Sequence, residues 1–274
     1  MSNLVSTGWL ADHLDQVRVV DASWYMPDEK REPAKEFEVA HIPGAVFFDI
    51  DGIADHATDL PHMMPTAGEF SRMVGALGIG DGETIVVYDG TGLFSAPRAW
   101  WMLKAMGHKD VKVLDGGFPK WKREGHAIET GPAHASSKFF TAIPKPAIMR
   151  DFDAVMGIVK DRSAQMVDAR SASRFNAQEP EPREGVRGGH MPGAINVPWR
   201  KMVAADGTLK PQAELREAFA DVDINQPIVT TCGSGISAAI LMLALNEIGA
   251  HDVALYDGSW TEWGARPEAP VVTG

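Results

Sequence analysis

The stretch TTCGSGISA, residues 230–238, contains Cys232, the only cysteine among 274 residues. A β-rich run ends at Cys232, two glycines follow, and a helical pattern begins near Ile236. Glycines let the backbone curl so that successive N–H groups point inward, and a helix N-terminus adds positive potential. Because both favour a thiolate, the stretch predicts a nucleophilic cysteine on a strand–loop–helix turn at the carboxyl end of a sheet.

Three other interpretations of this stretch are a core cysteine, a dinucleotide loop and a phosphatase loop. Free cysteines are often simply buried. Gly233, Gly235 and Ala238 fit the dinucleotide fingerprint, with Asp257 as the ribose-binding acid, but we expect the short remainder of the chain to be insufficient for such a half-domain. A cysteine phosphatase needs an arginine where this chain has Ala238, and no Lys or Arg lies between 232 and 246. The sequence of the loop therefore favours a reactive cysteine, and without a basic residue the loop is poorly suited to bind a dianion.

The elements that position this loop are written twice in the chain. Four segments of the first half recur in the same order in the second half, which predicts a tandem duplication. The pairs are VVDAS (19–23) with MVDAR (166–170), HIPGAVFFDI (41–50) with HMPGAINVPW (190–199), TIVVYDGTG (84–92) with PIVTTCGSG (227–235), and VKVLDGGFPKW (111–121) with VALYDGSWTEW (253–263).

Each half alternates short Val- and Ile-rich runs with stretches of helical period, which predicts an α/β fold: a three-layer domain with a central parallel sheet flanked by helices. Strands are predicted at 17–20, 45–48, 84–88, 111–114, 165–168, 194–197, 227–231 and 252–256. Helices are predicted near 67–77, 94–106, 150–160, 211–220 and 236–248. We expect a first domain at 1–132, a linker at 133–148 and a catalytic domain at 149–274.

The duplication separates residues needed by the shared fold from residues needed by one half. His41 and His190 each precede Pro-Gly-Ala, so we expect both to have structural roles. Asp89 stands in the first half where Cys232 stands in the second. A carboxylate lacks the nucleophilic sulfur, so we expect one active site per chain.

Composition excludes several classes of function. A net charge of −11, from 37 acidic and 26 basic residues, would repel a nucleic acid backbone. The longest apolar run, 238–245, is too short to cross a bilayer, and the start has no basic region before an apolar core. The nine histidines show no metal-ligand spacing, and one cysteine forms no intramolecular disulfide. We therefore expect a cytoplasmic protein with no metal, no other cofactor, no nucleic acid partner and no membrane span.

With these motifs the sequence resembles the two-domain rhodanese-like sulfurtransferases, and within them the mercaptopyruvate branch. The resemblance covers nearly the whole chain. It is carried by DASWYMP (21–27), HIPGAVFFDID (41–51), LPHMMP (60–65), SAPRAWWM (95–102), EPEPR (179–183), CGSG (232–235) and YDGSWTEW (256–263). The thiosulfate branch has basic residues after its cysteine, whereas the mercaptopyruvate branch has a neutral Gly-Ser-Gly followed by Val-Thr or a close variant. Ile236-Ser237 is such a variant.

The resemblance implies roles for the residues that match the family pattern. Cys232 would be the nucleophile that takes sulfur as a persulfide, with Gly233, Gly235 and Ile236 around the bound substrate. Arg174 and Arg183 would bind the carboxylate and carbonyl of a 2-oxo acid, for which guanidinium forks are well suited.

A second implied group handles protons. Ser234, His62 and Asp51 match a proposed Ser-His-Asp relay, which suits a reaction whose product leaves as an enolate and must be protonated.

The predicted activity is transfer of sulfur from 3-mercaptopyruvate through a Cys232 persulfide, with release of pyruvate. The acceptor would be a thiol, such as a small thiol or thioredoxin, or cyanide. Two alternatives remain: a thiosulfate:cyanide sulfurtransferase, and a non-catalytic rhodanese-like binding or sulfur-carrier module.

Overall fold

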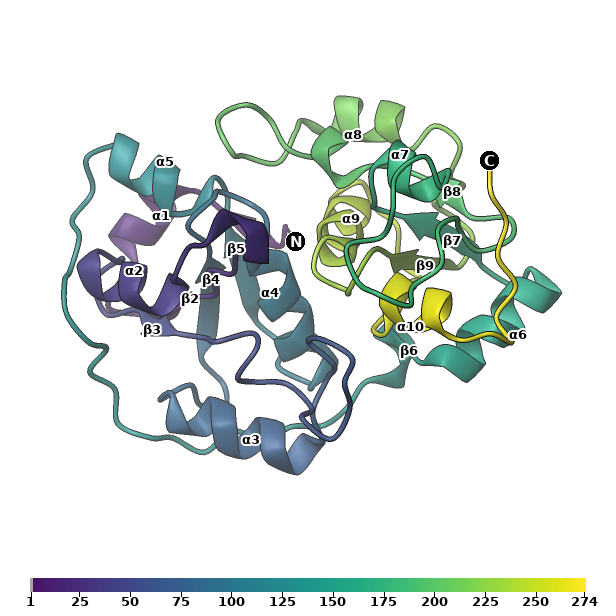
Figure 1. Ribbon diagram of the computed structural model, residues 1–274. Helices are drawn as coiled ribbons and strands as arrows, with labels where there is room; N and C mark the ends of the chain where they lie inside the picture. The colour runs from purple at the N-terminus through teal and green to yellow at the C-terminus, as the bar shows by residue number, and fades with distance from the viewer. Residues whose placement is uncertain (1) are drawn as a thin grey trace. The chain divides into compact units, whose positions relative to one another are not determined.

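The structure is a computed structural model that describes residues 2–274 (Figure 1). Packing of these residues divides the chain into two units. The first comprises residues up to His56 together with Met64–Lys145 and Ala204–Leu209. The second comprises Ala57–Met63, Pro146–Val203 and Lys210–Gly274. Each unit therefore includes a short segment from the other half of the sequence.

The first unit is built on a five-stranded parallel sheet of order β1-β5-β4-β2-β3. Its strands are β1 (Leu4–Val5), β2 (Val17–Asp21), β3 (Val46–Phe47), β4 (Thr84–Tyr88) and β5 (Val111–Leu114). Its helices are α1 (Thr7–Asp12), α2 (Pro33–Val39), α3 (Ala67–Ala76), α4 (Ala96–Ala105) and α5 (Gly117–Arg123), with the 3₁₀ helix η1 (Pro27–Glu29).

The second unit repeats this topology, with a five-stranded parallel sheet of order β6-β10-β9-β7-β8. Its strands are β6 (Met149–Arg150), β7 (Gln165–Asp168), β8 (Ile195–Asn196), β9 (Ile228–Thr231) and β10 (Val253–Tyr256). Its helices are α6 (Phe152–Asp161), α7 (Ala172–Phe175), α8 (Gln212–Ala218), α9 (Ala238–Glu247) and α10 (Ser259–Ala265), with the 3₁₀ helices η2 (Pro146–Ile148) and η3 (Trp199–Lys201). The common strand order confirms the α/β fold and the duplication.

Each sheet is buried on both faces because helices cover both (Figure 1). In the first unit one face packs against α1, α2 and α5 through Leu10, Phe37 and Trp121, while α4 packs on β4 and β5. In the second unit α6 and α10 cover one face with Phe152 and Trp263, and α9 packs on β9 and β10. Strands buried on both faces read as continuous apolar runs, which is why the sequence revealed them.

Helix starts follow local capping chemistry. Thr66 caps α3 by accepting the Glu69 N–H at 3.4 Å, and the Glu69 carboxylate accepts the Thr66 N–H at 3.1 Å. Asp151 caps α6 by accepting the Ala154 N–H at 2.9 Å. These contacts fix where each of the two helices begins.

His41 and His190 have matching structural roles in the two units. His41 stacks on Phe37 with ring centroids 4.0 Å apart, and its Nδ1 lies 2.7 Å from the Phe37 carbonyl oxygen. His190 stacks on Phe175 at 3.7 Å, and its Nδ1 lies 2.9 Å from the Phe175 carbonyl oxygen. Each imidazole thus stacks on the ring of a phenylalanine and contacts the backbone carbonyl of the same residue, in agreement with the structural role predicted for both histidines.

The segment 133–145, predicted as the first part of a linker, groups with the first unit. The Lys138 N–H donates to the Gly75 carbonyl at 2.9 Å, and the Thr141 N–H donates to Asp81 at 2.8 Å. The chain therefore runs along α3 before it reaches β6. The domain boundaries proposed from the sequence, 1–132 and 149–274, remain a prediction.

Candidate active site

Cys232 follows β9 directly and lies in the loop that leads into α9. Its side chain is only 2% exposed, and its Sγ accepts the Gly235 N–H at 3.1 Å. Gly235 has a φ of 85°, a conformation that glycine adopts without the steric cost of a Cβ atom. The loop therefore curls back so that one of its N–H groups points at the sulfur. A backbone donor in this position stabilises negative charge on sulfur.

The first turn of α10 holds the main chain of the cysteine loop in place. The Trp260 N–H donates to the Cys232 carbonyl at 2.9 Å, and the Thr261 N–H donates to the Gly233 carbonyl at 2.9 Å. The Thr261 hydroxyl donates to the same Gly233 carbonyl at 2.6 Å. The loop is thus fixed by a neighbouring rigid turn rather than by its own contacts alone.

Ser259 has an unusual conformation in this turn. It is fully buried with a φ of 49°, in the left-handed region that non-glycine residues rarely occupy. Its hydroxyl accepts the Cys232 N–H at 3.3 Å and donates to the Tyr256 carbonyl at 2.9 Å. The repeat places Gly117, with a φ of 54°, at the matching position of the first unit. The second unit therefore accepts backbone strain and gains a hydroxyl under the cysteine.

Arg174, at the end of α7, lies directly against the cysteine loop. A Cβ atom added to Gly233 would lie 3.1 Å from Arg174 Nη2, so the guanidinium occupies the space beside this glycine. Ser171 caps α7 and so helps to fix the start of the short helix that carries Arg174. Arg174 therefore lies against the cysteine loop, and the substrate-binding role that the family resemblance implies for it remains a prediction.

Arg174 is the outer end of a buried series of four alternating charges. Asp168, the last residue of β7, accepts from Arg170 Nη2 at 2.7 Å and from Nε at 3.0 Å. Arg170 Nη1 donates to Glu181 Oε1 at 2.8 Å, and the other Glu181 oxygen pairs with Arg174 Nη2. Burial opposes the charged form of Arg170, but the two carboxylates outweigh burial and leave its pKa above the ordinary value.

Arg183 approaches the same loop through Thr261. Its Nη1 donates to Thr261 Oγ1 at 3.4 Å, and Thr261 in turn donates to the Gly233 carbonyl. Both arginines predicted from the family resemblance therefore lie around Gly233, Arg174 by direct contact and Arg183 through one hydroxyl. Cationic groups in this arrangement are suited to bind the oxygen atoms of a small anionic donor beside the sulfur.

The remaining predicted residues fall in different places. Ser234, 9% exposed, lies in the loop itself, and the side chain of Ile236 is buried in the core. His62 is buried with a φ of 61° and groups with the second unit. Asp51 is exposed in the first unit, where it accepts from Trp24 Nε1 at 2.9 Å. The relay that these side chains would form remains a prediction.

The matching loop of the first unit is occupied by its own carboxylate. Asp89 Oδ1 accepts from the Thr91 N–H at 2.9 Å, the Thr91 hydroxyl at 2.8 Å and the Gly92 N–H at 2.9 Å. Asp89 Oδ2 accepts the N–H groups of Phe94, Ser95 and Ala96 at 2.7, 3.0 and 2.9 Å. Five inward-pointing N–H groups thus surround the Asp89 side chain, which is the arrangement expected of an anion-binding loop.

Sequence reasoning missed Glu181, Ser259 and Thr261. For two of them the internal repeat contained a signal, because Ser259 and Thr261 stand where the first half has Gly117 and Pro119. Both substitutions add a hydroxyl that reaches the cysteine loop. Glu181 lies in the motif EPEPR, but nothing in the sequence pattern distinguishes it from the neighbouring Glu179.

Within residues 2–274 no group of three or more His, Cys, Asp or Glu side chains could hold a metal ion, and no helix is long and apolar enough to cross a membrane.

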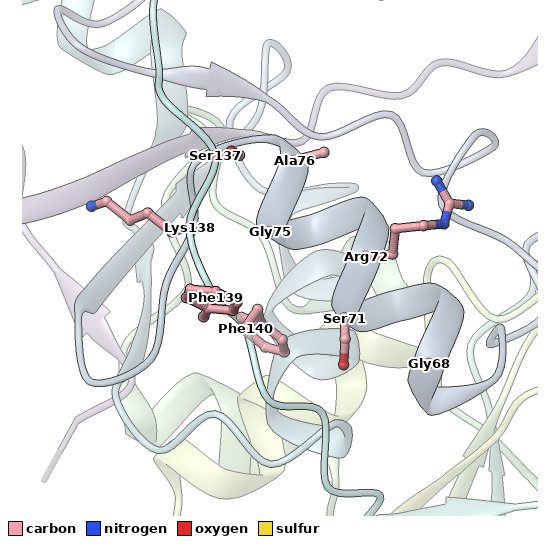
Figure 2. Close-up of a pocket in the computed structure, with 9 residues that line it drawn as sticks. All are labelled: Gly68, Ser71, Arg72, Gly75, Ala76, Ser137, Lys138, Phe139 and Phe140. Carbon is pink, nitrogen blue, oxygen red and sulfur yellow. The ribbon is translucent and has the colours of Figure 1, made fainter.

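A surface groove of about 400 Å³ lies in the first unit, between α3 and residues 137–140 (Figure 2). Its lining includes Arg72, Lys138 and Phe139 but none of the predicted site residues.

Comparison with known proteins identifies the class. The family model described as "Rhodanese-like domain" matches residues 6–124 and 152–266. Both units are therefore rhodanese-like domains. The cysteine loop follows β9, which is the fourth strand of the second unit in chain order. The chain belongs to the two-domain rhodanese-like sulfurtransferases.

Individual relatives match over nearly the whole chain. The 3-mercaptopyruvate sulfurtransferase of Escherichia coli (strain K12) is 43% identical over 97% of this chain and 96% of its own length. The mitochondrial thiosulfate/3-mercaptopyruvate sulfurtransferase 1 of Arabidopsis thaliana is 42% identical over 98% of this chain and 77% of its own length. A crystal structure of an Escherichia coli 3-mercaptopyruvate sulfotransferase superposes with a TM-score of 0.88 at 40% identity, covering 95% of this chain and 99% of that one. The protein is a sulfurtransferase enzyme, and its relatives' names include two sulfur donors.

Proposed function

We propose that this protein takes sulfur from 3-mercaptopyruvate rather than from thiosulfate. The observation that carries the proposal is the neutral loop after Cys232, flanked by two arginines. No Lys or Arg lies between residues 232 and 246, so the loop itself brings no cationic side chain to a dianion. Arg174 and Arg183 approach it from outside, where they can bind the carboxylate and the carbonyl of a 2-oxo acid.

The first half-reaction forms a persulfide on Cys232. The thiolate attacks the sulfur of 3-mercaptopyruvate, an S–S bond forms, and the bond between that sulfur and C3 breaks. The electron pair of the broken bond passes to C3, which gives the enolate of pyruvate. Arg174 and Arg183 stabilise the negative charge on the oxygens, and protonation at C3 completes pyruvate.

Proton handling is assigned to Ser234, His62 and Asp51 as part of the proposal. The thiol proton of the substrate must leave its sulfur, and one proton must reach C3 of the product. A hydroxyl and an imidazole oriented by a carboxylate suit both transfers. The Gly235 N–H, already 3.1 Å from Sγ, supports the negative charge of the Cys232 thiolate before it attacks the donor and again after the sulfur has passed to the acceptor.

The second half-reaction passes the outer sulfur to an acceptor. A thiolate or cyanide attacks that sulfur, the S–S bond breaks, and the electron pair returns to Cys232 as thiolate. We include a small thiol, thioredoxin and cyanide among the acceptors, and we place the reaction in the cytoplasm. Because the chain has one cysteine, it carries one persulfide.

The direct test compares two donors with the same acceptor. Pyruvate release from 3-mercaptopyruvate and sulfite release from thiosulfate are measured for the wild type and for Cys232→Ser. We expect the wild type to have a higher kcat/KM for 3-mercaptopyruvate, and the serine variant to lose at least about a thousandfold with either donor, since it lacks the nucleophile.

Other outcomes would support the alternatives. A higher kcat/KM for thiosulfate would favour a thiosulfate:cyanide sulfurtransferase. Persulfide formation without turnover, detected by intact mass, would favour a sulfur-carrier module. Activity retained by the serine variant would remove Cys232 from the chemistry.

A further inference from the structure

Glu181 is a carboxylate with two cationic partners and almost no contact with solvent. Its side chain is 3% exposed and lies between Arg170 and Arg174. Arg170 is already held by Asp168 through three side-chain hydrogen bonds and by the Gly189 carbonyl at 2.8 Å. Glu181 is therefore anchored on its inner side by a buried side chain that has several other hydrogen bonds, and Glu181 holds Arg174 in turn.

The four charges of this series sum to zero. Asp168 and Glu181 contribute two negative charges, and Arg170 and Arg174 contribute two positive charges. A formally cationic side chain thus lies against Gly233 with its charge already balanced by a buried neighbour. Coulomb interactions at these distances are strong inside a protein, so the balance changes the potential that a bound anion experiences.

The two candidate donors differ in charge and in shape. 3-Mercaptopyruvate, with its thiol protonated, has one carboxylate charge and a neutral carbonyl beside it. Thiosulfate has two negative charges and no carbonyl. A guanidinium that is oriented but neutralised favours the first donor, because it still offers directed N–H groups yet attracts a dianion only weakly.

We propose that Glu181 determines donor specificity: it orients Arg174 against Gly233 and cancels its charge, so that the site selects a singly charged 2-oxo acid thiol over a dianionic donor. This proposal rests on the proposed function, because it assumes that the donor binds beside Arg174. Glu181 acts as a positioning residue through Arg174 and does not touch the reacting atoms.

The test is Glu181→Gln with Glu179→Gln as its matched control. Both substitutions remove one negative charge from the same five-residue segment, EPEPR. Glu179 is exposed and accepts from the Ser171 hydroxyl at 3.0 Å, whereas the Glu181 side chain is buried and contacts both Arg170 and Arg174. The readout is the kcat/KM for 3-mercaptopyruvate divided by the kcat/KM for thiosulfate.

We expect E181Q to shift this ratio toward thiosulfate by roughly tenfold or more, since an uncompensated charge acts more strongly on the dianion. E179Q should stay within about twofold of the wild type, because an exposed charge is screened by solvent and salt. An unchanged ratio in E181Q, or an equal shift in E179Q, would overturn the proposal.

A second variant covers the case in which E181Q does not fold. Glu181→Asp keeps the charge but shortens the side chain by one methylene, so it cannot reach both arginines. We expect its KM for 3-mercaptopyruvate to rise at least roughly fivefold with little change in kcat, the pattern of lost binding. An unchanged KM would exclude the positioning role.

Failure of this proposal is distinguishable from failure of the proposed function. The proposed donor is tested by wild-type turnover and by Cys232→Ser, neither of which involves Glu181. If the wild type preferred thiosulfate, the donor assignment would fail, yet the shift between E181Q and E179Q would still report whether Glu181 sets the ratio.

Discussion

At the scale of single residues, Thr261 links a side chain to the backbone of the cysteine loop. Its hydroxyl donates to the Gly233 carbonyl at 2.6 Å and accepts from Arg183 Nη1 at 3.4 Å. Arg183 thus reaches the loop through the Thr261 hydroxyl, whereas Arg174 contacts Gly233 directly and pairs with the Glu181 carboxylate. The two arginines are therefore expected to contribute differently to donor binding.

Replacing Arg183 with alanine should weaken binding of the 2-oxo acid. A charge-assisted hydrogen bond contributes about 1.5–3 kcal/mol, so we expect KM for 3-mercaptopyruvate to rise roughly tenfold to a hundredfold. Arg183→Lys keeps the charge but not the fork, and should lie between the wild type and the alanine variant. Steady-state kinetics with both variants measures this, and an unchanged KM in Arg183→Ala would remove the residue from the site.

At the scale of secondary-structure elements, the turn that begins α10 supports the loop that begins α9. Ser259, the first residue of α10, has a left-handed backbone conformation, and its hydroxyl accepts the Cys232 N–H. A left-handed backbone costs a non-glycine residue about 1–2 kcal/mol. The serine is thus a compromise between backbone strain and a buried hydrogen bond.

Two substitutions separate these contributions. Ser259→Ala loses the hydroxyl and keeps the strain, whereas Ser259→Gly loses the hydroxyl and relieves the strain. Relief of the strain should raise the free energy of unfolding of the glycine variant by about 1 kcal/mol above that of the alanine variant. The entropy cost of glycine reduces this gain, so we expect the glycine variant to be the more stable by less than about 1 kcal/mol. Urea unfolding of the two proteins is the measurement, and a glycine variant less stable than the alanine variant would contradict this account.

The positions of several strands could be predicted from the sequence. The strands at 84–88 and 111–114 have the predicted bounds, because Val- and Ile-rich runs buried on both faces are unambiguous. The two-residue strands β1 and β6 were missed, since so short a strand is defined by its neighbour rather than by its own residues. The predicted helix near Ile236 begins at Ala238, after the loop has completed its turn around the sulfur.

The candidate site was predictable in part. Cys232 followed from the residues themselves, and Arg174 and Arg183 followed from the family resemblance. Glu181 was beyond both, because its role depends on burial between two arginines that approach it from other positions in the chain. From the sequence alone, a buried carboxylate in an acidic motif cannot be distinguished from an exposed one, because its partners come from other parts of the chain.

At the scale of the whole molecule, the two units treat the same buried aspartate differently. Asp168 is paired with Arg170, whereas the matching Asp21 has Ser23 as its partner, through the Ser23 N–H at 2.8 Å and the Ser23 hydroxyl. Burial raises the pKa of Asp21 to about 6, with Asp89 adding to the effect and the Ser23 hydrogen bonds opposing it. The first unit therefore contains a carboxyl group that keeps its proton up to about pH 6.

This difference predicts a pH dependence of stability. Between pH 4 and 6 folded Asp21 retains a proton that the unfolded chain has released, so its contribution to the free energy of unfolding falls as pH rises. The loss amounts to about 3 kcal/mol at most, at about 1.4 kcal/mol per pKa unit. Asp21→Asn should abolish this contribution.

The measurement is chemical unfolding of the wild type and Asp21→Asn at several pH values, with a probe in each unit because two units need not unfold together. The difference in free energy of unfolding, wild type minus variant, should decrease from pH 4 to pH 6 and then level off. A constant difference would show that Asp21 has no raised pKa.

The carboxylate of Asp89, enclosed by five N–H groups, has a consequence for how such a molecule can arise. A duplicated catalytic loop that loses its sulfur would leave several inward-pointing donors with no anion to satisfy them, at a cost in stability for each. An aspartate at the vacated position supplies that anion permanently. The loop of the first unit thus resembles an anion-binding site filled by its own side chain, which lets it persist as part of a stable scaffold.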